Sequence, residues 1–257
     1  MNAREPQTDF RSAVGNYLKK HAFGVFAPKA VIFDMDGVLF DSMPYHAKSW
    51  HEVCEEYGLP MSPEEAYLHE GRTGAATINI LTQRHWKREA TPDEVSKIYA
   101  EKCRLFNDCP EAPKMPGAED ILRKVKADGL TIVVVTGSGQ KSLLDRLGHN
   151  YPGYFSPERI VASKDVTHGK PAPEPYLKGL EKAGVNPWEA VVVENAPLGV
   201  KAGVAANVFT VAVNTGPLPD SALLDEGADL LFPSMQAWAD AWDDFFATTH
   251  GLACPND

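Results

Sequence analysis

Two aspartates follow directly on a short apolar run near the start of the sequence. Residues 30–33 read Ala-Val-Ile-Phe, and Asp34, Asp36 and Gly37 come soon after them. Such a run predicts a buried strand of a parallel sheet, and open α/β sheets bind ligands beyond the carboxyl ends of their strands. Because carboxylates this close repel each other, the spacing favours a bound Mg²⁺ or a nucleophile paired with a general acid. The alternative is an ordinary Asp-Gly turn after an edge strand.

A second group of polar residues follows the apolar run 133–135. Thr136, Gly137 and Ser138 offer hydroxyl groups and accessible backbone N–H groups where the next helix is expected to start. Helix N-termini bind anions through such N–H groups, so this stretch is a candidate phosphate-binding site. Taken alone, it fits an ordinary Thr or Ser helix cap with flexible glycines better.

A lysine and an acid–amide pair complete this set of polar groups. Lys170 stands in the sequence Gly-Lys-Pro-Ala-Pro, where prolines restrict the backbone, and could neutralise crowded carboxylates and a phosphoryl group. The alternative is a solvated surface lysine. Glu194 and Asn195 end the apolar run 191–193 and carry oxygen atoms suited to Mg²⁺. Since the carboxyl ends of parallel strands share one edge of a sheet, we expect all of these groups in one crevice.

The composition limits the possible partners. The chain has 257 residues and a formal net charge of -10, which argues against nucleic acid or an anionic membrane as the main partner. A bound cation and a few basic residues can still attract an anionic substrate locally. The four cysteines show no Cys-x-x-Cys pairing, so we expect reduced thiols in a cytoplasmic protein. Residues 1–28 lack the apolar segment of a signal peptide, and no run is long enough to span a membrane.

Hydrophobic periodicity divides the chain into an α/β core and a helical insertion. Residues 1–28 are predicted to be an N-terminal extension with a helix over about 9–21 that packs outside the core. The stretch 43–116 shows helical patterns and almost no strand signal, which predicts a separate helical domain. Residues 29–42 and 117–250 form the predicted core, a Rossmann-like parallel sheet in which strands and helices alternate. The helices expected in the insertion cover 44–57, 63–69, 74–85 and 91–107.

The core elements follow from the same patterns. The final helix carries Trp238 and Trp242, which are more typical of a packed core than of a cofactor site. The expected core strands cover 30–33, 130–135, 160–162, 190–193, 208–213 and 230–232. The expected core helices cover 118–127, 138–147, 173–183, 197–206 and 235–247.

Taken in order, the motifs resemble those of the haloacid dehalogenase-like superfamily, and within it the β-phosphoglucomutase-like branch of phosphatases and phosphomutases. The resemblance extends from about residue 29 to residue 242 and implies a helical cap domain inserted between the first two motifs. It also implies Mg²⁺ as cofactor and a phosphohydrolase that works through an aspartyl-phosphate. The motifs that carry it are Asp34-x-Asp36-Gly, Thr136-Gly, Lys170-Pro and Glu194-Asn195.

The resemblance implies a role for each catalytic residue. Asp34 would attack phosphorus, while Asp36 would protonate the leaving group and then deprotonate the attacking water. Thr136 and the backbone N–H of Gly137 would hold the transferring phosphoryl group, and Lys170 would bridge it to Asp34. Dehalogenase-type members lack the second acid, so Asp36 points to phosphatase or mutase chemistry.

The resemblance also implies the metal ligands. Mg²⁺ would bind Asp34, the main-chain oxygen of Asp36 and Asn195, with Glu194 binding directly or through a water. The family often has an acid where this chain has Asn195. The site is therefore one charge less negative, which would weaken Mg²⁺ binding or suit a more anionic substrate.

The cap is expected to determine the substrate. His46 and Lys102 match positions that β-phosphoglucomutases use, but Glu70-Gly-Arg72-Thr-Gly replaces the Lys-Gly-x-Ser-Arg loop typical of a mutase. An acid here makes sense if Glu70 reaches the metal when the cap closes, and the loop closely resembles that of an inorganic pyrophosphatase in this family. The resemblance therefore implies hydrolysis of pyrophosphate, with His46, Arg72 and Lys102 binding the anion.

Other interpretations remain open from the sequence. A β-phosphoglucomutase or sugar-phosphate phosphatase is the main alternative, and a non-catalytic metabolite sensor is a weaker one because all catalytic positions are filled. His46 could instead cap a helix, Arg72 could pair with Glu70, and Lys102 could be solvated. We expect a monomeric enzyme whose partner is a small phosphorylated molecule.

Overall fold

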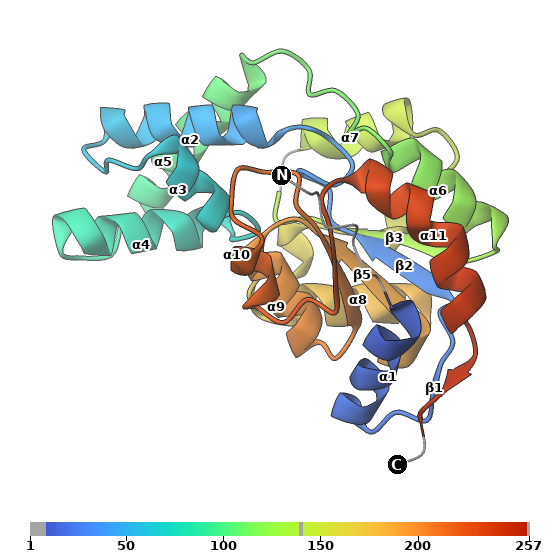
Figure 1. The fold of residues 1–257 in the computed structure, drawn as a ribbon. Helices are drawn as coiled ribbons and strands as arrows, with labels where there is room; N and C mark the ends of the chain where they lie inside the picture. The colour runs from blue at the N-terminus through green and yellow to red at the C-terminus, as the bar shows by residue number, and fades with distance from the viewer. Residues whose placement is uncertain (1–8, 139–140, 256–257) are drawn as a thin grey trace, which may run out of the picture.

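A six-stranded parallel sheet lies at the centre of the described part of the chain, residues 9–138 and 141–255 of the computed structural model (Figure 1). The strand order is β4-β3-β2-β5-β6-β7, so that β2 and β5 lie in the middle. Counted from β2, this is the 3-2-1-4-5-6 order of a Rossmann-like sheet, which confirms the predicted fold class. The strands are β2 (Ala30–Phe33), β3 (Thr131–Val135), β4 (Ile160–Val161), β5 (Ala190–Glu194), β6 (Phe209–Val213) and β7 (Leu230–Phe232).

The two central strands are apolar until their carboxyl ends and are buried on both faces of the sheet. They pair in register from Ala30 opposite Ala190 to Phe33 opposite Val193. Phe33 joins the apolar cluster on one face, whereas its neighbour Ile32 joins the cluster on the other. Polar residues therefore emerge together between β2 and β5, where the strand order reverses and ligands bind in open α/β sheets.

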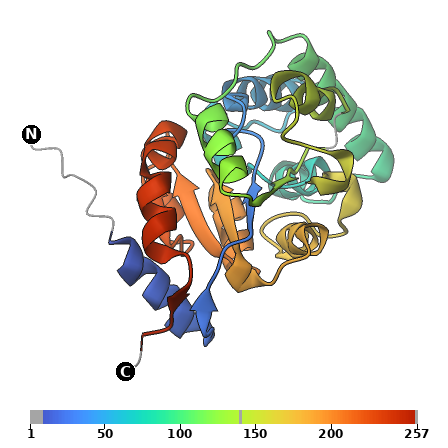
Figure 2. The same cartoon turned by 90° about the vertical axis from the view of Figure 1, so that its right-hand side faces the viewer.

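Helices cover both faces of the sheet (Figure 2). Trp238 and Trp242 of the last helix are buried in the larger apolar cluster, as predicted. None of the described helices combines the length and apolar composition needed to cross a membrane. The helices on the face of the larger cluster are α1 (Phe10–His21), α6 (Ala118–Ala127), α7 (Lys141–Asn150) and α11 (Met235–Thr249), and those on the other face are α8 (Glu174–Ala183) and α9 (Pro197–Ala205).

A separate group of helices follows β2 and lies at one end of the sheet (Figure 1). Their apolar faces form a cluster of their own, which includes Val53, Leu81 and Ile98. Ser62 and Thr91 cap two of these helices by accepting backbone N–H groups. The predicted helices agree with them to within one residue at each end, while the domain boundaries stay a prediction. The helices are α2 (Met43–Glu56), α3 (Pro63–Leu68), α4 (Gly74–Trp86) and α5 (Pro92–Asn107).

Several short elements differ from the prediction. β1 (Val25–Phe26) pairs antiparallel with β8 (Leu252–Ala253), and two-residue strands are too short to produce a periodic pattern. The helix predicted from residue 138 begins instead at Lys141, while Gly139 and Gln140 lie outside the described residues. The remaining short helices are η1 (Pro157–Arg159), η2 (Ser163–Asp165), η3 (Pro187–Glu189) and α10 (Ser221–Leu224).

Asp229 is a largely buried acid just before β7. Its carboxylate accepts the backbone N–H of Thr210 at 2.8 Å. Burial raises the pKa of Asp229 to about 6, so the folded protein binds this proton more tightly than the unfolded chain does. The contribution of Asp229 to stability is therefore present at low pH and falls as the pH rises from about 4 through 6.

Asp229→Asn keeps an oxygen that can accept this hydrogen bond but removes the buried charge. We expect the free energy of unfolding to rise by only about 2 kcal/mol at pH 8, because partial exposure to water weakens the cost of the buried charge. At pH 4 it should stay unchanged. Urea denaturation at both pH values measures the change. Asp225→Asn, at an exposed acid nearby, should change neither value. An equal gain at both pH values for Asp229→Asn would contradict this explanation.

Candidate active site

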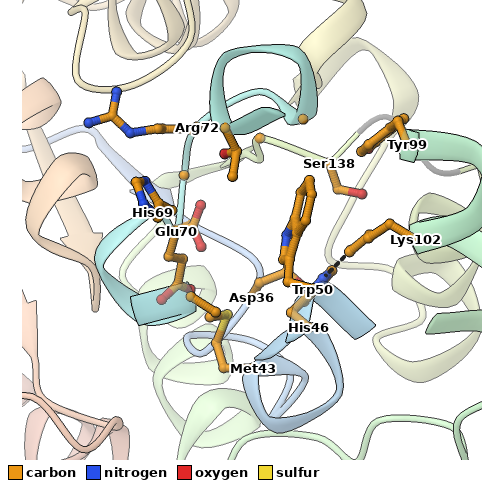
Figure 3. A pocket seen from close by; sticks show the side chains of 16 residues that line it. Asp36, Met43, His46, Trp50, His69, Glu70, Arg72, Tyr99, Lys102 and Ser138 are labelled. Carbon is orange, nitrogen blue, oxygen red and sulfur yellow. Dashed lines mark hydrogen bonds and ion pairs between the residues drawn. The ribbon is translucent and has the colours of Figure 1, made fainter. Parts of the chain in front are cut away.

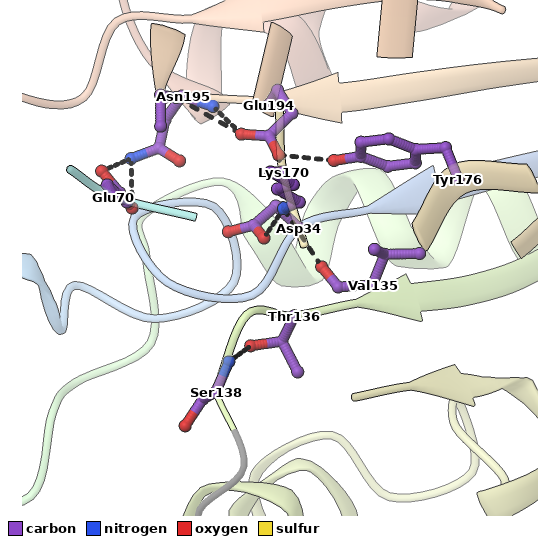
Figure 4. Close-up of polar contacts among 10 residues, drawn as sticks. Asp34, Glu70, Val135, Thr136, Ser138, Lys170, Tyr176, Glu194 and Asn195 are labelled. Carbon is purple, nitrogen blue, oxygen red and sulfur yellow. Dashed lines mark hydrogen bonds and ion pairs between the residues drawn. The ribbon is translucent and has the colours of Figure 1, made fainter. Parts of the chain in front are cut away.

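Asp34 and Lys170 meet at the carboxyl end of β2 (Figure 4). Asp34 follows the strand, Lys170 comes from the loop before α8, and both are buried. The Lys170 ammonium donates to Asp34 Oδ1, to Glu194 Oε1 at 2.6 Å and to the carbonyl oxygen of Val135 at 3.5 Å. The lysine thus links the ends of β2, β3 and β5, and the structure brings these predicted site residues together.

The turn after β2 requires Gly37. Its φ of +80° is a left-handed conformation that favours glycine. A Cβ atom at this position would lie 2.0 Å from the side-chain nitrogen of Asn195, so glycine allows the turn to pack against Asn195. The Thr215 hydroxyl supports the same turn by donating to the carbonyl oxygen of Gly37 at 2.7 Å. Thr215 is far from this turn in the sequence, so no local pattern could have indicated its role.

Glu194, at the end of β5, is fully buried and surrounded by hydrogen-bond donors. Its Oε1 accepts from Lys170 and from the Tyr176 hydroxyl. Its Oε2 accepts the backbone N–H groups of Asn195 and Ala196 at 3.0 and 3.3 Å. A carboxylate has about four acceptor positions, and these donors use them. The geometry therefore directs Glu194 toward Lys170, and metal binding by Glu194 stays a prediction.

A chain of polar contacts connects Asp36 to the helical domain (Figure 3). Its Oδ1 accepts from the Ser42 hydroxyl at 2.6 Å and lies 3.2 Å from His46 Nε2. The other ring nitrogen of His46 lies 2.7 Å from the ammonium of Lys102. The His46 ring also stacks on Phe106, with 4.2 Å between the ring centres. His46 and Lys102 were predicted to bind the substrate, and in the structure they are linked to Asp36 through this chain of contacts. Ser42 and Phe106 were not predicted as site residues.

The surroundings shift the pKa values of the two aspartates in opposite directions. Burial raises the pKa of Asp34 to about 8, with Lys170 opposing the change and Glu194 adding to it. Burial also opposes ionisation of Asp36, but His46, Ser42 and Lys102 hold the pKa of Asp36 below its ordinary value. The expected roles, an ionised Asp34 as nucleophile and a protonated Asp36 as acid, stay a prediction. The shifts differ because burial and acidic neighbours act on Asp34, whereas hydrogen-bond donors surround Asp36.

The oxygen atoms around Asp34 suit a hard divalent cation. Asn195 Oδ1 is buried and has no hydrogen-bond partner among the described residues, while the side-chain nitrogen donates to Glu70 at 3.1 Å. Burial, followed by the charges of Asp34 and Glu194, raises the pKa of Glu70 well above its ordinary value. An unpartnered amide oxygen beside crowded carboxylates fits Mg²⁺. Within residues 9–138 and 141–255, no three His, Cys, Asp or Glu side chains are grouped so that they could hold a metal ion by themselves.

The loop over residues 69–73 closes against the core. A Cβ atom on Gly137 would lie 2.9 Å from the carbonyl oxygen of Gly71. Gly71 has a φ of +85° and packs against the side chain of Lys170. Behind the loop is a cavity that opens to solvent (Figure 3). Its walls include Asp34, Asp36, His46, Glu70, Lys102 and Ser138.

Two residues that were predicted to bind the substrate, Arg72 and Thr136, make no hydrogen bond or ion pair with the side chains of Asp34 or Asp36 within the described part of the chain. Arg72 contributes to the wall, but Figure 3 shows its guanidinium pointing away from Asp36 and Lys102. Its buried Nε has no partner in the described part of the chain. Thr136 is buried at the end of β3, where its hydroxyl accepts the backbone N–H of Ser138 at 3.0 Å (Figure 4). This bond orients the hydroxyl that was predicted to contact the phosphoryl group.

The cavity wall also contains residues that sequence reasoning missed. They are Met43, Trp50 and Tyr99. Trp50 and Tyr99 lie in α2 and α5, where their helical spacing is typical of ordinary packing residues. Only the position of the helices over the core shows that these side chains face a cavity.

Comparison with known proteins identifies the family of these motifs. A model of the family described as haloacid dehalogenase-like hydrolase matches residues 31–213. Hexitol phosphatase A of Escherichia coli is 33% identical over 214 residues, which cover 81% of this chain and 92% of the relative. The phosphorylated carbohydrates phosphatase of Thermotoga maritima is 32% identical over 205 residues, which cover 78% and 92%.

A solved structure agrees with these relatives. A protein from Bacteroides vulgatus, provisionally described as a β-phosphoglucomutase, superposes with a TM-score of 0.91 at 55% identity. The match covers 93% of this chain and 98% of the other. The resemblance predicted from the four motifs is therefore confirmed at the level of family and branch. None of these three names refers to a pyrophosphatase.

Gly137→Ala is expected to hinder closure of the loop over residues 69–73. The added methyl group would lie 2.9 Å from the carbonyl oxygen of Gly71, a backbone atom that cannot move aside freely. We expect kcat/KM for p-nitrophenyl phosphate to fall about tenfold to a hundredfold, with an unchanged melting temperature. In Gly148→Ala, the new methyl group meets nothing within 4 Å, so activity should persist. Unchanged activity in Gly137→Ala would show that the loop does not close this way during turnover.

Proposed function

The chain belongs to the haloacid dehalogenase-like hydrolase family, and we propose that it hydrolyses phosphate esters of small sugars through a phosphorylated Asp34. The names of two relatives, a hexitol phosphatase and a carbohydrate phosphatase, support this substrate class. The contact between Lys170 and Asp34 at the end of the central strand carries the proposal. A lysine held there neutralises charge on the carboxylate and on an incoming phosphoryl group.

In this mechanism Asp34 is the nucleophile. One of its carboxylate oxygens attacks phosphorus in line with the leaving oxygen, and the bond between phosphorus and the sugar oxygen breaks. Lys170 remains beside Oδ1 and stabilises the charge of the transferring group. The Thr136 hydroxyl and the backbone N–H of Gly137, at the end of β3, hold the phosphoryl oxygens.

Asp36 moves the protons. As an acid it protonates the oxygen of the leaving sugar, and as a base it takes a proton from the water that hydrolyses phosphorylated Asp34. Ser42 and His46 orient its carboxylate and, against the effect of burial, keep the pKa of Asp36 low, which suits the second step. Lys102 holds His46 in turn, so the helical domain acts on the chemistry through Asp36.

Mg²⁺ is the cofactor that the donor atoms favour. Asp34, the main-chain oxygen of Asp36 and the unpartnered Asn195 Oδ1 would hold it, with Glu70 as a further ligand from the closing loop. When bound, the ion supplies positive charge that lowers the pKa of Asp34 and neutralises the phosphoryl group. We assign residues 43–116 as the cap that closes over this site.

The cavity favours a leaving group that is organic and hydroxylated. Trp50, Tyr99 and Met43 provide a partly aromatic wall, against which the C–H groups of a sugar can pack.

We propose hydrolysis and not a mutase reaction, because Glu70 stands where the loop of a mutase typically has a lysine that grips a second phosphate.

A panel of phosphorylated compounds tests both the activity and its substrate class. We expect Mg²⁺-dependent release of phosphate from hexitol and hexose phosphates, with kcat/KM at least about tenfold above that for pyrophosphate. Asp34→Asn should lose about a thousandfold or more of kcat while circular dichroism shows an intact fold. Asp240→Asn, at an exposed acid, should retain full activity.

The panel also separates the alternatives. Full turnover by Asp34→Asn would exclude Asp34 as the nucleophile. Faster release of phosphate from pyrophosphate than from any sugar phosphate would exclude the proposed substrate class. Conversion of β-glucose 1-phosphate to glucose 6-phosphate faster than phosphate appears would identify a mutase.

Pyrophosphate is a second candidate substrate because of the position of Glu70. The Glu70 carboxylate oxygens lie 3.1 and 3.3 Å from the side-chain nitrogen of Asn195, so the closing loop carries an acid to the proposed metal site. A loop tied to the metal in this way suits a small, strongly anionic substrate that also binds through the metal.

Glu70→Gln tests whether this acid takes part in metal binding. We expect the variant to need about tenfold more Mg²⁺ for half-maximal activity and to bind Mn²⁺ correspondingly more weakly in calorimetry without substrate. Glu64→Gln makes the same change at an exposed residue of α3 and should leave both values unchanged. If Glu70→Gln and Glu64→Gln behave alike, Glu70 does not bind the metal.

A further inference from the structure

Tyr176 is a buried tyrosine in the first turn of α8 that the proposed mechanism does not use (Figure 4). None of its surface is exposed. Its hydroxyl donates to Glu194 Oε1, and the centre of its ring lies 5.2 Å from the Lys170 ammonium. Tyr176 therefore contacts both members of the ion pair between Lys170 and Glu194.

The donors and acceptors of this ion pair are matched. A lysine ammonium has three N–H groups, and those of Lys170 have acceptors in Asp34 Oδ1, Glu194 Oε1 and the Val135 carbonyl. Glu194 Oε2 is occupied by the two backbone N–H groups that follow it. The Tyr176 hydroxyl supplies the remaining donor, at Oε1. Each group thus has one favourable arrangement, in which the ammonium also contacts Asp34.

Loss of the Tyr176 hydroxyl would leave Lys170 as the single donor to Glu194 Oε1 among the described residues. The carboxylate would then attract the ammonium more strongly and draw it away from Asp34. Glu194 itself has little room to move, because it is fully buried and two backbone N–H groups hold its Oε2. The lysine is therefore the group that shifts.

We propose that Tyr176 is a positioning residue for phosphoryl transfer, whose hydroxyl shares Glu194 with Lys170 and so keeps the ammonium against Asp34. Tyr176 acts through these two side chains and does not touch the substrate. The inference rests on the proposed role of Asp34 as the nucleophile.

Tyr176→Phe removes the hydroxyl and keeps the ring. We expect kcat to fall about tenfold while KM stays within twofold, because Lys170 acts mainly on charge that develops in the transition state. Beryllium fluoride, which mimics a phosphoryl group on an aspartate, gives a readout without turnover. With Mg²⁺ present, its affinity measured by calorimetry should also fall about tenfold.

Tyr17→Phe is the matched control. Tyr17 is equally buried, and its hydroxyl donates to the carbonyl oxygen of Asn207 at 2.9 Å, away from the site. This variant should lose stability comparable to that of Tyr176→Phe but keep kcat and beryllium fluoride affinity. If Tyr176→Phe behaves like Tyr17→Phe in these two measurements, the inference is overturned.

A double-mutant cycle tests whether Tyr176 acts through Glu194. In a Glu194→Ala background, adding Tyr176→Phe should change kcat by less than twofold. A further tenfold loss would show that Tyr176 acts by another route. Should Glu194→Ala fail to fold, the beryllium fluoride titration of the single variant decides. No binding by the wild-type protein would overturn the role of Asp34 as well, whereas equal binding by wild type and Tyr176→Phe would overturn only the role of Tyr176.

Discussion

The balance of charge at the ends of β2 and β5 governs the rest of the site. Asp34 and Glu194 leave neighbouring strands, Glu70 approaches from the closing loop, and buried Lys170 contacts the first two. Burial makes the remaining repulsion costly, and it raises the pKa values of Asp34 and Glu70. Such a site favours a divalent cation and, through that cation, a phosphoryl group. The same balance explains why Glu194 is held by four donors instead of facing the cavity.

Side chains of the helical domain contact the polar groups at the ends of the core strands. His46 and Lys102 come from α2 and α5, yet against the effect of burial they help to hold the pKa of Asp36 on the core below its ordinary value. Glu70 connects the loop before α4 to Asn195 in the core. If residues 43–116 act as the proposed cap, its closure changes the surroundings of both aspartates at once, which gives a physical reason for reaction to follow only when a substrate is enclosed.

Local patterns predicted the main elements well. The strand at residues 30–33 and the helix at 118–127 agree with β2 and α6 at both ends, because apolar runs and cap residues are properties of short stretches. β1 and β8 were missed because each is stabilised by a partner more than two hundred residues away. Ser42 and Tyr176 were missed for a similar reason, since a hydroxyl near a motif has no signature until its partner is known.

The sequence by itself determined the fold class, the family and the set of polar residues at the strand ends, because periodicity and motif order depend on neighbours along the chain. Only the tertiary structure decided how those residues are used. It paired Glu194 with Lys170 and Tyr176, turned the guanidinium of Arg72 away from Asp36, and shifted the pKa values of Asp34 and Asp36 in opposite directions. These outcomes depend on burial and on distances between residues from different strands, which no local pattern contains.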